Sequence, residues 1–93
     1  MATGRPLIPE MIKVLLFGRL GDLHSGSSID IELNDSLKTA SDVRDRLSSE
    51  FPDLSKALSE PQTLIALNQK IVGADQPLSS GDELAFLPPV TGG

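Results

Sequence analysis

Two hydrophobic patterns in the first third of the chain predict a pair of β-strands. Residues 11–17 (MIKVLLF) are rich in Ile, Val, Leu and Phe and stop at Gly18, which is typical of a largely buried strand. Polar and apolar residues alternate over 28–33 (SIDIEL), which is typical of a strand with one face in water. The Gly/Ser-containing stretch 18–27 between them is interpreted as a turn region. We therefore expect an antiparallel hairpin.

The hydrophobic spacing becomes helical after residue 39. Apolar residues then recur three or four positions apart, at Ala40, Val43, Leu47 and Phe51. Thr39 is a suitable N-cap, and Pro52 disfavours helical geometry at the residue before it. We expect one main helix of about three turns. Residues 53–60 are ambiguous, because their two leucines are also compatible with a short helical turn.

Three short extended segments complete the predicted fold. They lie at 64–67, 70–73 and 83–87 and are separated by turn-forming residues. Pro88 and Pro89 end the last strand because neither can donate a ladder hydrogen bond. This order of elements predicts an α+β fold in which one main helix packs across one face of a mixed sheet.

Length and composition limit the classes of protein that fit. A chain of 93 residues has room for one compact core, and we expect a domain at 11–93 preceded by a flexible leader at 1–10. The net charge of -5 disfavours nucleic acid as a partner. Apolar runs such as 14–17 are far below the roughly 18 residues of a membrane span. Because the N-terminus has no signal-peptide pattern, we expect a cytoplasmic protein.

Conventional catalytic and metal-binding patterns are missing from the sequence. The chain has no cysteine, and its single histidine, His24, has no partner in sequence that suggests catalysis. The segment 18–21 (GRLG) lacks the Gly-Lys-Ser/Thr ending of a phosphate-binding loop. The acidic residues between Asp30 and Asp35 lack the spacing of a calcium loop. We therefore expect no metal site and no bound cofactor.

The C-terminal tail is the strongest candidate for chemistry. The last predicted strand runs directly into Pro88, Pro89, Val90, Thr91, Gly92 and Gly93. The two prolines favour an extended direction, and six residues can project roughly 20 Å. Two terminal glycines place no Cβ next to the carboxylate, so the tail can enter a narrow channel. Because Gly-Gly alone has little specificity, the dipeptide by itself would favour an inert end.

The longer C-terminal pattern is more specific. The string 82–93 (DELAFLPPVTGG), together with the strand at 11–17 and the segment 67–69 (LNQ), resembles the molybdopterin synthase small subunit family. These ubiquitin-like sulfur carriers have the β-grasp fold, and the resemblance covers residues 11–93. It implies that an E1-like enzyme adenylates Gly93 with ATP and that a sulfurtransferase system then converts Gly93 to a thiocarboxylate.

The same resemblance implies partners and a partner surface. The tail, residues 88–93, would enter the large subunit of molybdopterin synthase, within a heterotetramer, and pass sulfur to cyclic pyranopterin monophosphate. The carrier would complete its partner's active site rather than act as an enzyme alone. The apolar contact patch of the family corresponds to Phe17, Ile71 and Leu87, for which burial in the core is the competing interpretation.

Two other functions are compatible with the Gly-Gly ending. One is sulfur delivery to thiazole or to tRNA, although the Pro88-Pro89-Val90 sequence and the length argue against the thiazole carrier. The other is conjugation to proteins, in which a target lysine would attack activated Gly93. The sequence leaves both alternatives open.

Overall fold

The computed structural model describes residues 10–24 and 27–89. Its elements are, in order, β1 (Met11–Leu16), α1 (Arg19–His24), β2 (Ser28–Glu32), α2 (Ala40–Glu50), α3 (Pro52–Ser59), β3 (Leu64–Leu67), β4 (Lys70–Val72) and β5 (Glu83–Leu87). The predicted leader, apart from Glu10, and the tail residues Val90, Thr91, Gly92 and Gly93 lie outside the described residues.

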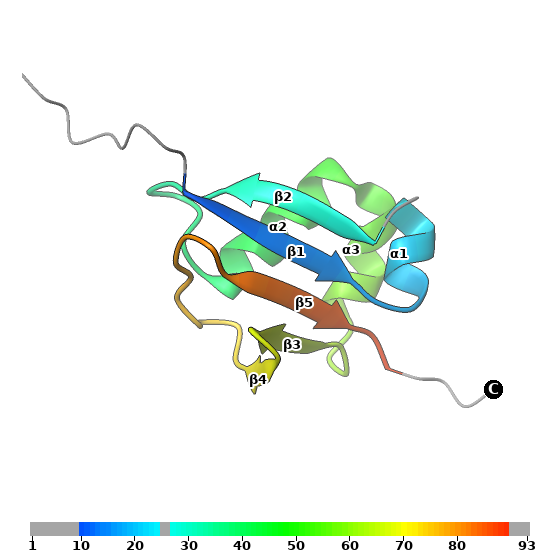
Figure 1. Ribbon diagram of the computed structural model, residues 1–93. Helices are drawn as coiled ribbons and strands as arrows, with labels where there is room; N and C mark the ends of the chain where they lie inside the picture. Colours follow the sequence, from blue (N-terminus) through cyan, green and yellow to red (C-terminus); the bar gives the residue numbers. More distant parts are fainter. Residues whose placement is uncertain (1–9, 25–26, 90–93) are drawn as a thin grey trace, which may run out of the picture.

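The strands form one mixed sheet, in the order β2-β1-β5-β3-β4. β1 pairs antiparallel with β2, as the hairpin prediction requires, and parallel with β5. β3 pairs antiparallel with both β5 and β4. Figure 1 shows the three helices together behind the sheet, which leaves the face toward the viewer without a helix. The predicted α+β arrangement, with helices packed across one face of a mixed sheet, is confirmed.

Two helices differ from the sequence-based expectations. Residues 19–24, expected within a turn, form the short helix α1, and Leu20 of this helix is fully buried. Six residues are too few to display a hydrophobic period, so sequence patterning could not find the helix. Residues 53–60, left ambiguous, lie mostly in α3, which buries both of its leucines. Pro52 fits there because the first helical turn has no partner for its missing N–H.

The hydrophobic core lies between the sheet and the helix layer. β5 is the central strand, and its Leu84 and Phe86 are completely buried. Core residues of β1 alternate at Ile12, Val14 and Leu16, as one face of a strand requires. The helices bury Leu20, Ala40, Val43, Leu47, Leu54, Ala57 and Leu58 against them. The strand that leads into the tail is therefore held from both sides and from behind.

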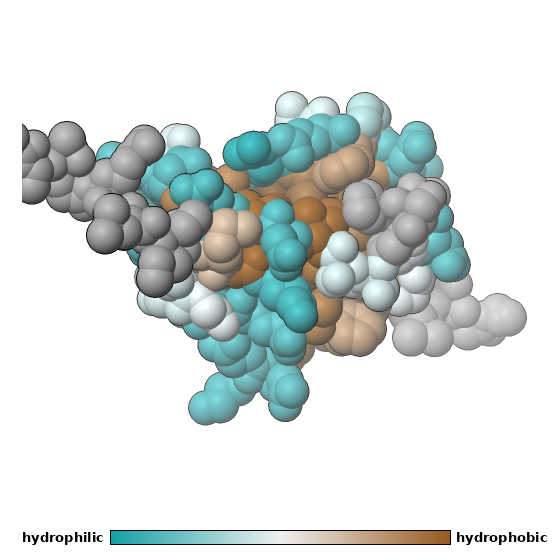
Figure 2. Space-filling model, turned by 45° about the horizontal axis from the view of Figure 1, so that its top comes forward, coloured by the Kyte–Doolittle hydropathy of each residue, from teal (hydrophilic) through white to brown (hydrophobic). Residues whose placement is uncertain are grey.

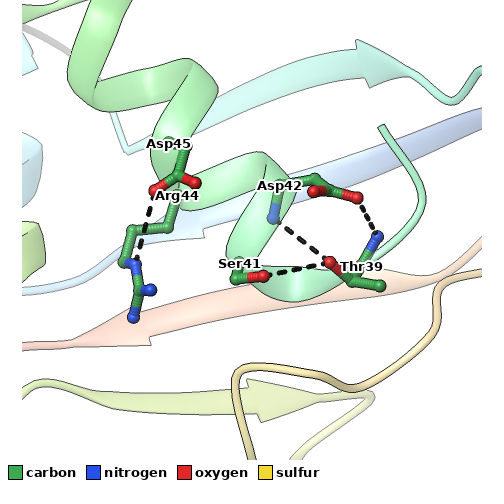
Figure 3. A network of polar contacts seen from close by, with 5 residues as sticks. All are labelled: Thr39, Ser41, Asp42, Arg44 and Asp45. Atoms are coloured by element: carbon green, nitrogen blue, oxygen red, sulfur yellow. Dashed lines mark hydrogen bonds and ion pairs between the residues drawn. The ribbon is translucent and has the colours of Figure 1, made fainter. Parts of the chain in front are cut away.

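A capping box fixes the start of α2, and its N-cap is Thr39, as expected from the sequence. The Thr39 hydroxyl accepts a hydrogen bond from the Asp42 backbone N–H at 3.2 Å, and the Asp42 carboxylate accepts one from the Thr39 N–H at 3.0 Å (Figure 3). The Lys38 N–H also donates to Asp42, at 2.9 Å. Hydrogen bonds from Lys38 and then Thr39 lower the pKa of Asp42 below its ordinary value. The cap therefore fixes the residue at which α2 begins.

Candidate functional site

The base of the tail lies at the end of β5. Leu87 ends the strand and pairs with Leu64 of β3, and Pro88 and Pro89 follow it, both half-buried. On the other side, the Phe17 N–H donates to the Phe86 carbonyl at 3.2 Å. The prediction that the prolines end the last strand is confirmed. The tail therefore starts from a strand fixed by hydrogen bonds to both neighbours.

The helix-free face of the sheet carries an apolar patch beside this point. Phe86 and Ile65 point into the core, so strand alternation directs Leu87 and Leu64 to the open face. Phe17 is 46% exposed, Leu64 50% and Ile71 61%, whereas Leu87 between them is half-buried. Ala66 and Ala85 are paired neighbours on the same face, and both are buried. We define the apolar patch as Phe17, Leu64, Ile71 and Leu87.

Three members of the patch are residues that the sequence suggested as a partner surface, and their contact with a partner stays a prediction. Phe17 and Ile71 are too exposed for the alternative of core burial, and Leu87 lies between the strands that carry them. Sequence reasoning missed Leu64. The segment LIAL is apolar throughout, so its period does not reveal which residues face the core, and only the pairing with β5 does so.

A charged row borders the patch on the open face. Lys13 of β1 is paired with Asp30 of β2 on one side and with Glu83 of β5 on the other. The row carries one more negative than positive charge, and Met11 lies beyond it at the start of β1. Figure 2 shows hydrophilic surface running directly alongside apolar surface on the molecule. A protein that covers both regions would need an apolar centre and a partly basic border.

The helix layer has a hollow that is lined mostly by charged residues, unlike the apolar patch. A cavity of about 410 Å³ between α1 and α3 is lined by charged residues of both signs, and Arg19 and Glu60 approach each other to 3.6 Å at its edge.

His24 ends α1 rather than lying in a loop. Among the described residues, no group of three or more His, Cys, Asp or Glu side chains could hold a metal ion. No helix in this part of the chain has the length and apolar character needed to cross a membrane.

Sequences of known proteins match most of the chain. The sequence profile described as the ThiS family matches residues 14–93. The chain is 36% identical over 83 residues to the molybdopterin synthase sulfur carrier subunit of Escherichia coli, covering 89% of this chain and all of the relative. The match extends to the Gly-Gly end and includes every residue of the apolar patch.

Solved structures of other proteins share the fold. The crystal structure of SAMP1 from Haloferax volcanii has a TM-score of 0.76 and 25% identity, covering 89% of this chain and 99% of that one. A complex of subunits 1 and 2 of molybdopterin-converting factor from Helicobacter pylori contains a chain with a TM-score of 0.63 and 28% identity. That match covers 89% of this chain and 99% of the Helicobacter chain. The ubiquitin-like β-grasp assignment is therefore confirmed.

Proposed function

The chain belongs to the ThiS family, and we propose that it is the sulfur carrier subunit of a molybdopterin synthase, with the Gly93 carboxylate as its working group. The observation that supports this most is the 36% identity over the whole length of the Escherichia coli subunit of that name. The absence of cysteine from the sequence adds to it, because no side-chain thiol is available to carry sulfur. The terminal carboxylate is the group that remains.

The proposed chemistry starts from an unreactive carboxylate. An activating enzyme uses ATP to form an acyl-adenylate at Gly93 and releases pyrophosphate. The adenylate gives the Gly93 carbonyl a good leaving group, AMP. A persulfide sulfur of a donor protein then attacks the carbonyl and displaces AMP. Reductive cleavage of the resulting acyl disulfide by a thiol leaves a thiocarboxylate. The carrier itself contributes an accessible end without Cβ atoms, so these partners can surround the reacting carbon.

The apolar patch and the tail can then act together on the large subunit. The complex from Helicobacter pylori is one of subunits 1 and 2 of molybdopterin-converting factor, which supports a heteromeric assembly for this chain. Docking through the patch would hold β5 in place. The four residues after Pro89 could reach about 13 Å into a cleft of the partner. The thiocarboxylate sulfur then bonds to cyclic pyranopterin monophosphate. Water hydrolyses the acyl–sulfur bond, so the sulfur stays on the pterin and Gly93 returns to a carboxylate.

Ile71→Asp should weaken binding to the large subunit and leave the fold intact. Its side chain is 61% exposed on β4, so a carboxylate there stays hydrated in the free carrier but would be desolvated in the complex. We expect a loss of more than about 1 kcal/mol, roughly fivefold in Kd, by calorimetric titration. Met11→Asp is the matched control, because Met11 is exposed beyond the charged row and should change Kd little. A large fall in the Tm of Ile71→Asp would instead assign Ile71 to the core.

Reconstitution tests the function as a whole. Thiocarboxylated carrier, mixed with a molybdopterin synthase large subunit and cyclic pyranopterin monophosphate, should yield molybdopterin. Intact-mass measurement should show the carrier returning from thiocarboxylate to carboxylate as the product appears. Sulfur transfer to a thiazole synthase with none to the pterin precursor would contradict the proposal. Adducts between Gly93 and protein lysines as the main product would favour the modifier alternative.

A further inference from the structure

Gly18 lies directly against the base of the tail. This glycine follows Phe17 at the turn from β1 into α1 and has a φ of +57°. A Cβ built on Gly18 would lie 3.4 Å from Cγ of Pro88. The hydrogen bond from Phe17 N–H to the Phe86 carbonyl holds the two segments together just before this contact. A Cβ alone would fit at this distance as an ordinary van der Waals contact, so only a longer side chain could enter the space of the Pro88 ring.

We propose that Gly18 is a positioning residue for the C-terminal tail: its bare Cα seats Pro88 and thereby sets the direction in which the chain leaves β5. The inference rests on the proposed function, because the direction of the tail affects activity only if Gly93 is the reacting group. The contact with Pro88 is an additional feature of this position.

The effect of a side chain at this position follows from geometry. A Cβ alone would make an ordinary contact with the ring, but atoms beyond it would compete with Pro88 for space. Pro88 has a fixed φ and follows a central strand, so it can yield only by turning the chain after it. A change of direction at Pro88 would displace the residues that follow it. Displacements of about 1 Å can slow a reaction about a hundredfold.

The competing explanation is that glycine is present only for its positive φ. Gly81 separates the two explanations. It has a φ of +88° and lies in the turn before β5, but a Cβ built there meets nothing within 4 Å. Asn tolerates positive φ better than other side chains. Gly18→Asn and Gly81→Asn therefore both place a side chain on a positive-φ backbone, and only the first contacts the tail.

Turnover should distinguish the two variants. With saturating thiocarboxylated carrier, we expect Gly18→Asn to reduce the kcat of molybdopterin formation by at least tenfold, and Gly81→Asn by less than twofold, with Tm values monitored for both. Gly18→Ala shares the positive φ but adds only a Cβ in ordinary contact with Pro88, so it should lose less than twofold in kcat, and a loss as large as that of Gly18→Asn would overturn the inference. Equal losses of kcat in Gly18→Asn and Gly81→Asn would overturn the inference and leave only the backbone requirement.

Two further measurements separate an effect on the tail from an effect on docking. In chains ending at Leu87, Gly18→Asn should leave Kd for the large subunit unchanged, because no tail remains to be redirected. In the free full-length carrier, Gly18→Asn should shift the amide resonances of residues 90–93, whereas Gly81→Asn should not. Unchanged tail resonances, or a weaker Kd in the shortened chain, would overturn the inference. A wild-type carrier that forms no molybdopterin would contradict the proposed function instead, and the resonances would still test the positioning.

Discussion

A chain shortened by Gly93, or lengthened by one residue after it, should lose sulfur transfer completely and keep its fold. The proposed chemistry lies beyond the last described contacts of β5, and Pro89 is only half-buried. Removing Gly93 withdraws the reacting carbon by about 3.3 Å, and adding a residue moves the carboxylate outward by the same distance. Either change misplaces the reacting atom by more than catalytic geometry tolerates.

Mass spectrometry and thermal unfolding should be followed together in this experiment. After incubation with the activating enzyme, ATP and the sulfur donor, wild-type carrier should gain the mass difference of sulfur replacing oxygen, whereas both altered chains should not. The control is one extra residue ahead of Met1, which changes the length equally and should not affect loading. Normal loading of the lengthened chain would contradict the assignment of Gly93. A large fall in Tm would show that the tail has a structural role.

The sequence predicted the strands better than the short helices. Alternation in β2 and the apolar run of β1 are direct consequences of one buried face, so both were found within one or two residues. α1 was missed because six residues are too few to display a helical hydrophobic period. Pro52 follows the end of α2 and is also the first residue of α3. From sequence, a proline in this position indicates the end of a helix and does not show that another begins.

The proposed chemistry of the tail rests on the sequence, whereas the surface beside it could be predicted from the sequence only in part. Terminal chemistry depends on the last residues alone and needs no tertiary information. The patch depends on register: Leu64 joins it because it pairs with Leu87, and that pairing joins segments more than 20 residues apart. The contact between Gly18 and Pro88 depends on the parallel pairing of β1 with β5, which no local pattern encodes.

Phe86→Ala should be the most destabilising single change near the tail. Phe86 is fully buried in the central strand, and truncating it would open a cavity in the core cluster. Such truncations cost about 3–5 kcal/mol, out of a total of roughly 5–15 kcal/mol for a domain. We expect urea unfolding to show a lower midpoint with a loss in this range. Sulfur loading should fall only in proportion to the unfolded fraction.

Leu87→Ala is the matched control because it is the next residue on the opposite face of β5. Its side chain is half-buried and belongs to the apolar patch, so truncation should cost less stability and weaken large-subunit binding more. The two variants should therefore show opposite patterns: Phe86→Ala in unfolding free energy and Leu87→Ala in Kd. Equal losses of stability would mean that Leu87 supports the core as strongly as Phe86. The division of β5 into a core face and a docking face would then be wrong.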